Sequence, residues 1–345
     1  MFQPNTIIWF NKKNASAHFV SIATIKINLG LWNDFNKSGF KVNFASNLPR
    51  KHLQFIQTGN AMRIMVLGVT GMLGNAMFRV LLENAALNVY GTARSESSKQ
   101  YFSEHLHNQI IVGVDVENHD SLVKAFATVK PDVVVNCVGL VKQLADANDP
   151  LLAVPINTLL PHRLAALCQA TSARLVHIST DCVFSGSKGG YLESDFPDAY
   201  DLYGRSKLLG EVDYPHAITL RTSIIGHELS GHRSLVNWFL AQQGSVKGFT
   251  RAIFSGLPTV ELATVVRDAV LPHQELHGLY HVASKPINKF DLLQLVAKAY
   301  GKAIEINPSE DLVIDRSLNA DRFKQATGYE SPEWSALVQR MYEFK

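Results

Sequence analysis

The sequence predicts an α/β protein in which a doubly wound, mostly parallel sheet is followed by a smaller C-terminal lobe. From Met62 onward, short apolar runs alternate with stretches of helical period, which is the pattern of strand–helix–strand units. Several runs, such as residues 133–135, are apolar on consecutive positions, so helices are expected on both faces of the sheet. After Arg221 the alternation loosens into helices, which predicts the lobe.

The first strand–helix–strand unit is the clearest. Residues 63–67 are a short apolar run typical of a buried strand, and Leu73, Met77 and Leu81 then recur at four-residue intervals, as on one face of a helix. Further strands are expected at residues 87–92, 110–114, 132–138, 175–179 and 278–282. Further helices are expected at residues 121–126, 157–168, 235–243, 260–269 and 290–300.

The first 61 residues differ from the rest of the chain. They are rich in Asn, Lys, Phe and Ile and show no clear helical period. Because this kind of fold usually begins at its first strand, we expect Met62 to be the true start and residues 1–61 not to be native. The alternative is a genuine extension, in which the alternating residues 19–31 add an edge strand. We expect residues 62–222 to form the main domain and residues 223–345 to form mainly the lobe.

Composition and charge exclude several classes of function. The 33 basic and 30 acidic residues give a net charge of only +3, and no dense block of Lys and Arg occurs, so nucleic acid is not an expected partner. No stretch has the apolar length of a membrane span, and no signal-peptide pattern is present. The histidines lack ligand spacing, so no metal is expected. Cys137, Cys168 and Cys182 form no paired framework, which predicts the cytoplasm.

A glycine motif follows the first strand. Its glycines are spaced G-x-x-G-x-x-G at the one turn where backbone must approach a pyrophosphate and where the dipole of the next helix meets anionic oxygens. The motif predicts the nucleotide-binding turn of a Rossmann domain, although a tight packing turn has the same composition. The cofactor contacts expected from this turn are Gly68, Thr70, Gly71, Met72, Leu73 and Gly74.

The end of the second strand favours NADPH over NADH. Arg94 stands where an NAD enzyme usually carries an acidic residue for the ribose 2′-hydroxyl. A guanidinium pairs with a 2′-phosphate, whereas a carboxylate repels it. The alternative is a solvated loop arginine.

A tyrosine and a lysine four residues apart predict the catalytic pair. Tyr203 and Lys207 fall on the same face of a helix. A free tyrosine has a pKa of about 10, and we expect the ammonium of Lys207 to favour its ionised form. In a reduction, Tyr203 would donate a proton to a carbonyl oxygen that Thr180 also hydrogen-bonds. Ser179 is the alternative hydroxyl, because neighbouring strand residues face opposite ways.

Together these motifs resemble the extended short-chain dehydrogenase/reductases and, among them, the dTDP-4-dehydrorhamnose reductase family. The resemblance extends from Met62 to about Tyr300. Beyond the glycine and catalytic motifs it uses residues 179–181 with 183–184, residues 191–195, residues 203–204 with 206–207 and 210–211, and residues 220–223, 256–259 and 278–281. It implies NADPH-dependent reduction of a nucleotide-linked 4-keto-6-deoxyhexose in surface polysaccharide synthesis, with the lobe holding the nucleotide sugar. Lys207 would also hold the nicotinamide ribose, and Tyr203 is a further expected cofactor contact.

Topology and the resemblance also place two further cofactor segments. Asp115 and Val116 after the third strand would lie near the adenine, and Cys137, Val138 and Gly139 would lie on the nicotinamide side of the cleft.

Two departures from the family leave the sugar open. Cys182 stands where these reductases usually carry Tyr, and Asn237 and Trp238 lie in a helix whose counterpart is usually less bulky. A UDP-linked 2-acetamido-4-keto sugar is therefore an alternative substrate. Asn237, Trp238 and Thr259 are the expected substrate contacts, with packing or capping as the alternative for each.

Other activities share the fold. A 4,6-dehydratase is expected to carry an acidic residue directly after the Thr-Asp pair, where this chain has Cys182, and an epimerase retains NAD tightly. A third alternative is a non-catalytic NADP-binding regulatory subunit, similar to the β subunit of methionine adenosyltransferase. The oligomeric state, a homodimer included, stays open.

Overall fold

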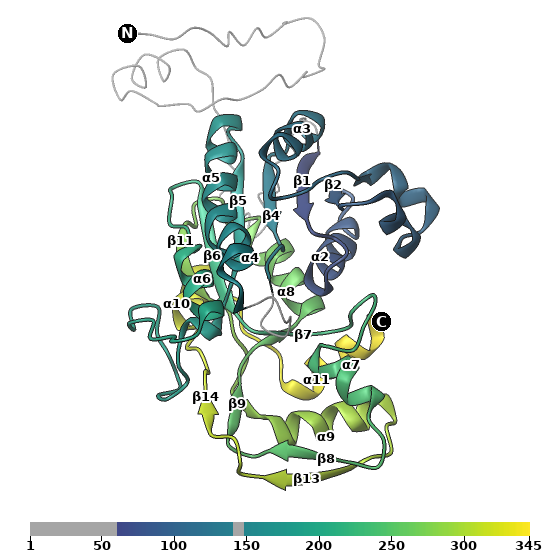
Figure 1. Cartoon of the computed structure of the whole chain (residues 1–345), viewed down its shortest axis with the longest axis vertical. Helices are drawn as coiled ribbons and strands as arrows, with labels where there is room; N and C mark the ends of the chain where they lie inside the picture. Colours follow the sequence, from purple (N-terminus) through teal and green to yellow (C-terminus); the bar gives the residue numbers. More distant parts are fainter. Residues whose placement is uncertain (1–60, 141–147) are drawn as a thin grey trace, which may run out of the picture. The chain divides into compact units, whose positions relative to one another are not determined.

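The central sheet of the protein is parallel throughout. The computed structural model describes residues 61–140 and 148–345, so the edge strand considered at residues 19–31 lies outside the described residues. In the described part, seven strands pair in the order β11-β6-β5-β4-β1-β2-β3 (Figure 1). These are β1 (Met62–Leu67), β2 (Leu87–Thr92), β3 (Ile110–Ile111), β4 (Val133–Asn136), β5 (Arg174–Thr180), β6 (Ala217–Thr222) and β11 (Gly278–His281).

This strand order confirms the predicted doubly wound fold. The strand order reverses between β1 and β4, where β1 has β2 on one side and β4 on the other. In open α/β sheets, ligands bind outside the carboxyl ends of the strands at such a switch point. The fold therefore brings the turns after β1, β4 and β5 to one edge of the sheet.

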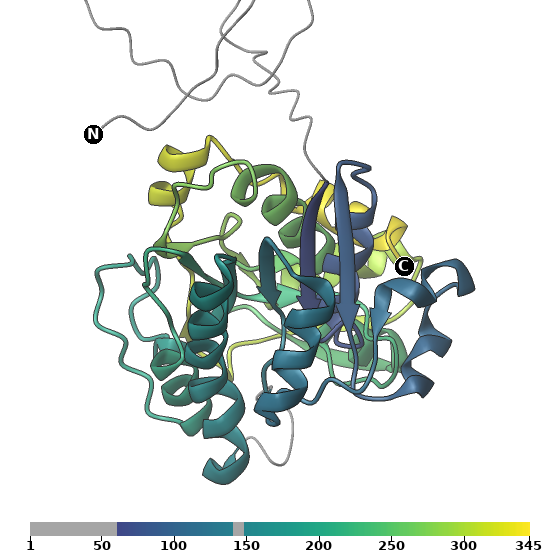
Figure 2. The same cartoon turned by 90° about the horizontal axis from the view of Figure 1, so that it is seen from above.

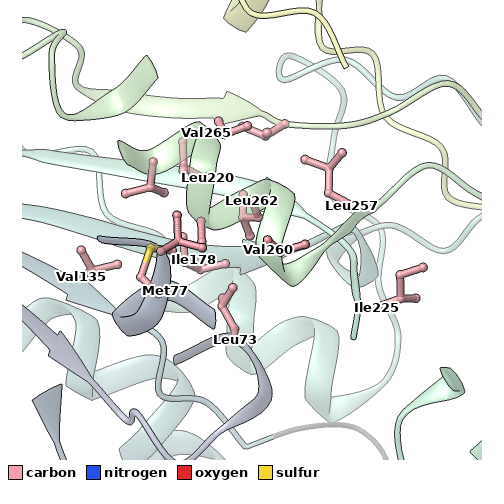
Figure 3. Close-up of a cluster of buried hydrophobic side chains, with 14 of the residues drawn as sticks. Leu73, Met77, Val135, Ile178, Leu220, Ile225, Leu257, Val260, Leu262 and Val265 are labelled. Carbon is pink, nitrogen blue, oxygen red and sulfur yellow. The ribbon is translucent and has the colours of Figure 1, made fainter. Parts of the chain in front are cut away.

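Helices cover both faces of the sheet (Figure 2). On one face α2 (Met72–Leu82), α8 (Thr259–Val265) and α11 (Trp334–Glu343) share a buried core with the sheet. Figure 3 shows Leu73 and Met77 of α2 packed near Val135, Ile178 and Leu220 of the strands. On the other face α3 (His119–Val129) and α5 (Leu160–Thr171) form a second core. The consecutive apolar residues of the strands supply both cores.

One long helical segment contains a π turn. It runs from α4 (Pro150–Ala153) through η5 (Val154–Leu159) into α5. Pro155 has no N–H to continue the hydrogen-bond ladder, and π turns occur where that ladder is interrupted. Pro150–Thr171 is long and apolar enough to cross a membrane, contrary to the expectation that no stretch would be. Its buried residues Leu164 and Cys168 pack in the second core, as in a core helix.

The lobe is built from small sheets and α9 (Lys289–Tyr300). Strand β8 (Ser245–Phe249) pairs with β13 (Glu305–Ser309), and β9 (Ala252–Phe254) lies between β12 (Ile287–Asn288) and β14 (Ile314–Asp315). In Figure 1 these elements lie together beyond the lower end of the main sheet. Residues 223–345 also contain β7 (Ile224–Ile225), β10 (Leu257–Pro258), α7 (Leu235–Ala241), α10 (Asp321–Thr327) and η7 (Val266–Val270). Helix α6 (Leu202–Leu209) precedes them, between β5 and β6.

The part of the chain after residue 222 also belongs to the main sheet. Strand β11 pairs with β6 through residues 278–281, and α8 and α11 pack in the first core. Sequence periodicity predicts β11, α7, α8 and α9 but misses α10 and α11. It also misses the short strands of the lobe, because two- to five-residue strands leave too few positions for a pattern.

Candidate active site

The glycine turn forms a narrow cradle at the start of α2. Gly68 has a φ of 82°, and a Cβ on Gly74 would lie only 2.0 Å from the Gly68 carbonyl oxygen. The turn therefore tolerates no side chain at Gly74. No side chain caps α2, so its first N–H groups remain for an anionic ligand. Thr70 and Gly71 are exposed, Met72 is half-buried, and the Leu73 side chain lies in the core.

Arg94 extends from the end of β2 into solvent. It is exposed, and among residues 61–140 and 148–345 it forms no hydrogen bond or ion pair. The neighbouring Ser95 hydroxyl contacts the hydroxyls of Ser97 and Ser98 instead. On the next loop, Asp115 accepts the N–H of Glu117 at 3.1 Å. Arg94 is thus free to pair with a phosphate, whereas the Asp115 carboxylate stabilises its own loop.

The turn after β4 packs against the glycine turn. A Cβ on Gly68 would lie 2.8 Å from Val138 Cγ2. Gly139 is exposed, and a Cβ there would lie 3.9 Å from the ammonium nitrogen of Lys207. Burial raises the pKa of the Cys137 thiol to about 12, so this thiol stays protonated. The structure therefore brings the predicted nicotinamide segment between the glycine turn and Lys207.

Tyr203 and Thr180 come together at the carboxyl end of β5. Tyr203 lies in the first turn of α6, which Asp201 caps by accepting the Gly204 N–H at 2.7 Å. Thr180 is within hydrogen-bonding reach of the Tyr203 phenol. Burial, followed by the nearby Cys182, raises the pKa of Tyr203 above its ordinary value. This direction is opposite to the predicted effect of Lys207, and it keeps the phenol protonated at neutral pH.

Lys207 lies one helical turn beyond Tyr203 and is buried. The residue is only 5% exposed, and its ammonium donates a hydrogen bond to the Ile178 carbonyl at 2.8 Å. Burial lowers the pKa of Lys207 to about 8, partly offset by Glu211. The ammonium therefore loses its proton at a pH only slightly above neutral.

Ser179 belongs to a different interaction. Its hydroxyl donates to a Glu211 carboxylate oxygen at 2.7 Å, and Glu211 forms a buried ion pair with Arg221 at 2.6 Å. Arg221 also lies over the Phe184 ring at 5.2 Å from its centroid. Of the two predicted hydroxyls, only Thr180 reaches the phenol.

Sequence reasoning missed Asn157. This residue lies in the π turn η5 and is 1% exposed. Its amide accepts the Leu140 N–H at 2.9 Å and donates to the Ser206 hydroxyl at 3.2 Å, which joins the β4 turn to α6. A Cβ on Gly139 would lie 3.5 Å from its oxygen. The available signal was Pro155 inside a helical stretch, because an interrupted helix often marks a functional position.

A charged cluster faces Cys182. Asp181 is 7% exposed, and burial raises the pKa of its carboxyl although Arg316 acts in the opposite direction. Lys289, at the start of α9, interacts electrostatically with Asp181 and Cys182, and burial lowers the pKa of its ammonium. Arg316 donates to the Phe184 carbonyl at 2.7 Å. The lobe thus brings two cations toward the end of β5, which the sequence did not predict.

The predicted substrate residues lie in the lobe or at its border. Asn237 accepts the Glu228 N–H at 3.2 Å and donates to the Gly231 carbonyl at 3.3 Å, so its amide stabilises the loop before α7. Trp238 is 39% exposed. Thr259 is buried at the start of α8. In the described residues, none of the three hydrogen-bonds to the Tyr203, Thr180 or Lys207 side chain. A hollow of about 430 Å³ beside α3 contains no predicted catalytic residue either.

Residues 62–343 match the family model described as the RmlD substrate binding domain. A probable low-salt glycan biosynthesis reductase of Haloferax volcanii is 31% identical over 235 residues, or 65% of this chain and 75% of that protein. A dTDP-4-dehydrorhamnose reductase of Mycolicibacterium smegmatis is 28% identical over 255 residues, or 70% of each chain. Methionine adenosyltransferase 2 subunit beta of Danio rerio is 27% identical over 252 residues, or 69% of this chain and 74% of that protein.

A solved structure shares the fold. The dTDP-4-dehydrorhamnose reductase of Bacillus anthracis, in complex with NADP, superposes with a TM-score of 0.66 at 20% identity. The alignment covers 82% of this chain and 99% of that one.

Proposed function

This chain belongs to the family of the RmlD substrate binding domain, and from that premise we propose that it is an NADPH-dependent reductase of a nucleotide-linked 4-keto-6-deoxyhexose. The single observation that carries the proposal is the position of Tyr203 and Thr180. Both lie at the carboxyl end of β5, beside buried Lys207 and at the same sheet edge as the glycine turn.

In the proposed reaction, Tyr203 is the proton donor. NADPH, when bound, supplies the hydride that reaches the carbonyl carbon. The Tyr203 phenol gives its proton to the carbonyl oxygen, which Thr180 holds by a hydrogen bond, and the product is the 4-hydroxy sugar. Lys207 stabilises the phenolate left behind by its positive charge. Burial raises the pKa of Tyr203, so the phenol is protonated before the reaction, and the positive charge of Lys207 is needed to ease release of that proton.

The proposed cofactor contacts fit NADPH. The glycine cradle and the uncapped start of α2 suit a pyrophosphate, and the free guanidinium of Arg94 suits a 2′-phosphate. Residues 62–222 would hold the dinucleotide, and residues 223–345 would hold mainly the nucleotide sugar. The three cysteines are free thiols, in keeping with a cytoplasmic enzyme of surface polysaccharide synthesis.

The decisive experiment is NADPH oxidation with a panel of dTDP- and UDP-linked 4-keto-6-deoxy sugars, with the products identified by NMR. Turnover of a dTDP sugar supports the proposal. If only UDP-2-acetamido sugars are turned over, the proposed substrate is wrong but the proposed reduction of a 4-keto group stands. A purified protein already loaded with NAD, or one that isomerises its substrate without consuming NADPH, indicates an epimerase.

The similarity to methionine adenosyltransferase 2 subunit beta favours a second candidate, a regulatory subunit that binds NADP without turnover. That candidate requires NADPH binding, no oxidation with any sugar of the panel, and capture of a catalytic partner. We favour the enzyme over the regulatory subunit because Thr180 and Tyr203 lie within hydrogen-bonding reach of each other.

Arg94→Ala is expected to raise the KM for NADPH about tenfold or more while leaving the KM for NADH nearly unchanged. The reason is that Arg94 has no other partner in the described residues and would contact only the 2′-phosphate. Steady-state kinetics with both cofactors measure this. Equal losses with NADPH and NADH would contradict the assignment.

The pH dependence of kcat follows from Lys207. A lysine is charged below its pKa, and the pKa of Lys207 is lowered to about 8. We therefore expect kcat to fall as pH rises through about 8, by about tenfold per pH unit beyond it. Lys207→Arg should move this decline to higher pH, because a guanidinium stays charged. A profile that is flat to pH 10 would contradict the role of the ammonium.

A further inference from the structure

His177 is a fully buried histidine that no step above uses. It lies in β5 with 0% exposure, opposite Asn136 of β4 and Thr219 of β6. Leu175, two residues earlier on the same strand, packs in the core that contains α5. Because strand residues two apart face the same side, His177 points into the layer between the sheet and α5.

The tautomer of His177 follows from its contact with Asn136. The Asn136 amide oxygen accepts the Val138 N–H at 3.1 Å, so the NH₂ end of this amide faces His177. That NH₂ group lies 3.1 Å from His177 Nδ1 and must donate to it. Nδ1 is therefore unprotonated, and the ring proton is on Nε2.

The other ring nitrogen has no partner. In residues 61–140 and 148–345, His177 Nε2 is the only buried side-chain nitrogen or oxygen without a hydrogen bond. A buried donor without an acceptor is destabilising, and an apolar side chain at this position would avoid the loss. A histidine here therefore needs a compensating role, and the acceptor atom Nδ1 supplies one.

That role concerns the turn after β4. The chain of hydrogen bonds runs from Val138 N–H to the Asn136 amide and on to His177. Val138 packs against Gly68, and Gly139 lies beside the Lys207 ammonium. The Lys207 ammonium in turn bonds to the carbonyl of Ile178, the residue after His177. His177 is thus adjacent to both the cofactor turn and the catalytic lysine.

We propose that His177 is a positioning residue, which orients the Asn136 amide through Nδ1 and so holds the turn of residues 137–140 in the shape that receives the nicotinamide side of the cofactor. This inference rests on the proposed NADPH binding. Both side chains are buried, so the Asn136–His177 pair would act indirectly, through the Val138 N–H.

The test uses variants that separate the two ring nitrogens. His177→Asn places an amide oxygen near the position of Nδ1, whereas His177→Leu removes the acceptor at similar size. We expect His177→Leu to raise the dissociation constant of NADPH, measured by fluorescence titration, about tenfold, the scale of one hydrogen bond. His177→Asn should stay within about threefold of wild type. Thr219→Val, on the neighbouring strand β6, is the matched control: it removes the hydroxyl that hydrogen-bonds the Val212 backbone and should lower stability without weakening NADPH binding.

A second measurement needs no cofactor and uses a variant only to assign the signals. ¹⁵N NMR of the histidine rings in the full chain without NADPH should show His177 as the neutral Nε2–H tautomer, assigned by the loss of its signals in His177→Asn. The Nδ1–H tautomer overturns the inference, as does equal weakening of NADPH binding by the Asn and Leu variants or by Thr219→Val. A wild-type protein that binds no NADPH instead refutes the proposed function, a different and distinguishable result.

Discussion

Replacement of Tyr203 by phenylalanine is expected to lower kcat by about 10²- to 10⁴-fold, the usual contribution of a positioned proton donor. The phenol is the group that Thr180 reaches at the end of β5, and it carries its proton before the reaction. The dissociation constant of NADPH should change little, because Lys207 and the glycine turn remain. Single-turnover rates and fluorescence titration measure the two effects separately.

A matched control distinguishes this loss from a general effect of removing a hydroxyl. Tyr200 lies three residues before Tyr203 and is 74% exposed. Tyr200→Phe should therefore retain wild-type kcat. Full activity of Tyr203→Phe would remove the proposed proton donor, and with it the proposed mechanism.

Glu211→Gln is expected to destabilise the fold by about 3–5 kcal/mol, the cost of leaving a buried charge without its partner. The side chains of Arg221 and Glu211 are 3% and 10% exposed, and their ion pair joins β6 to the segment after α6. Glutamine keeps the size of the side chain but removes the charge that neutralises Arg221. Urea denaturation should show a lower midpoint with an unchanged slope.

An exposed ion pair provides the comparison. Lys247 and Asp311 lie 2.8 Å apart, with side chains 67% and 66% exposed. Solvent screens such a pair, so Asp311→Asn should leave the midpoint unchanged. If Glu211→Gln also leaves the denaturation midpoint unchanged, the buried ion pair does not stabilise the position of β6.

The sequence predicts those parts of the site that depend on local pattern. The G-x-x-G-x-x-G spacing identifies the turn between β1 and α2, because only glycine fits where the Gly74 Cβ would meet the Gly68 carbonyl. Residues four apart on a helix likewise place Tyr203 and Lys207 on one face. The alternation of strands and helices is also local, and the observed strand order confirms the fold class that it predicts.

Other properties depend on residues far apart in the chain. The pKa of Tyr203 is raised because of burial, which tertiary packing decides, so its net shift is opposite to the lowering expected from Lys207. The choice between Ser179 and Thr180 depends on which way the strand faces, and Glu211 engages Ser179. Lys289 and Arg316 meet Asp181 only because the lobe returns to the sheet edge. Periodicity within a segment contains none of this information.

The late position of β11 in the sequence affects how the main sheet can form during synthesis of the chain. Strand β11 pairs with β6, yet residues 223–277 separate the two in sequence. While the ribosome produces that intervening stretch, the outer edge of β6 carries unpaired N–H and C=O groups. Open sheet edges of this kind are where nascent chains aggregate. This edge of β6 can therefore be covered by β11 only after residue 281 has left the ribosome.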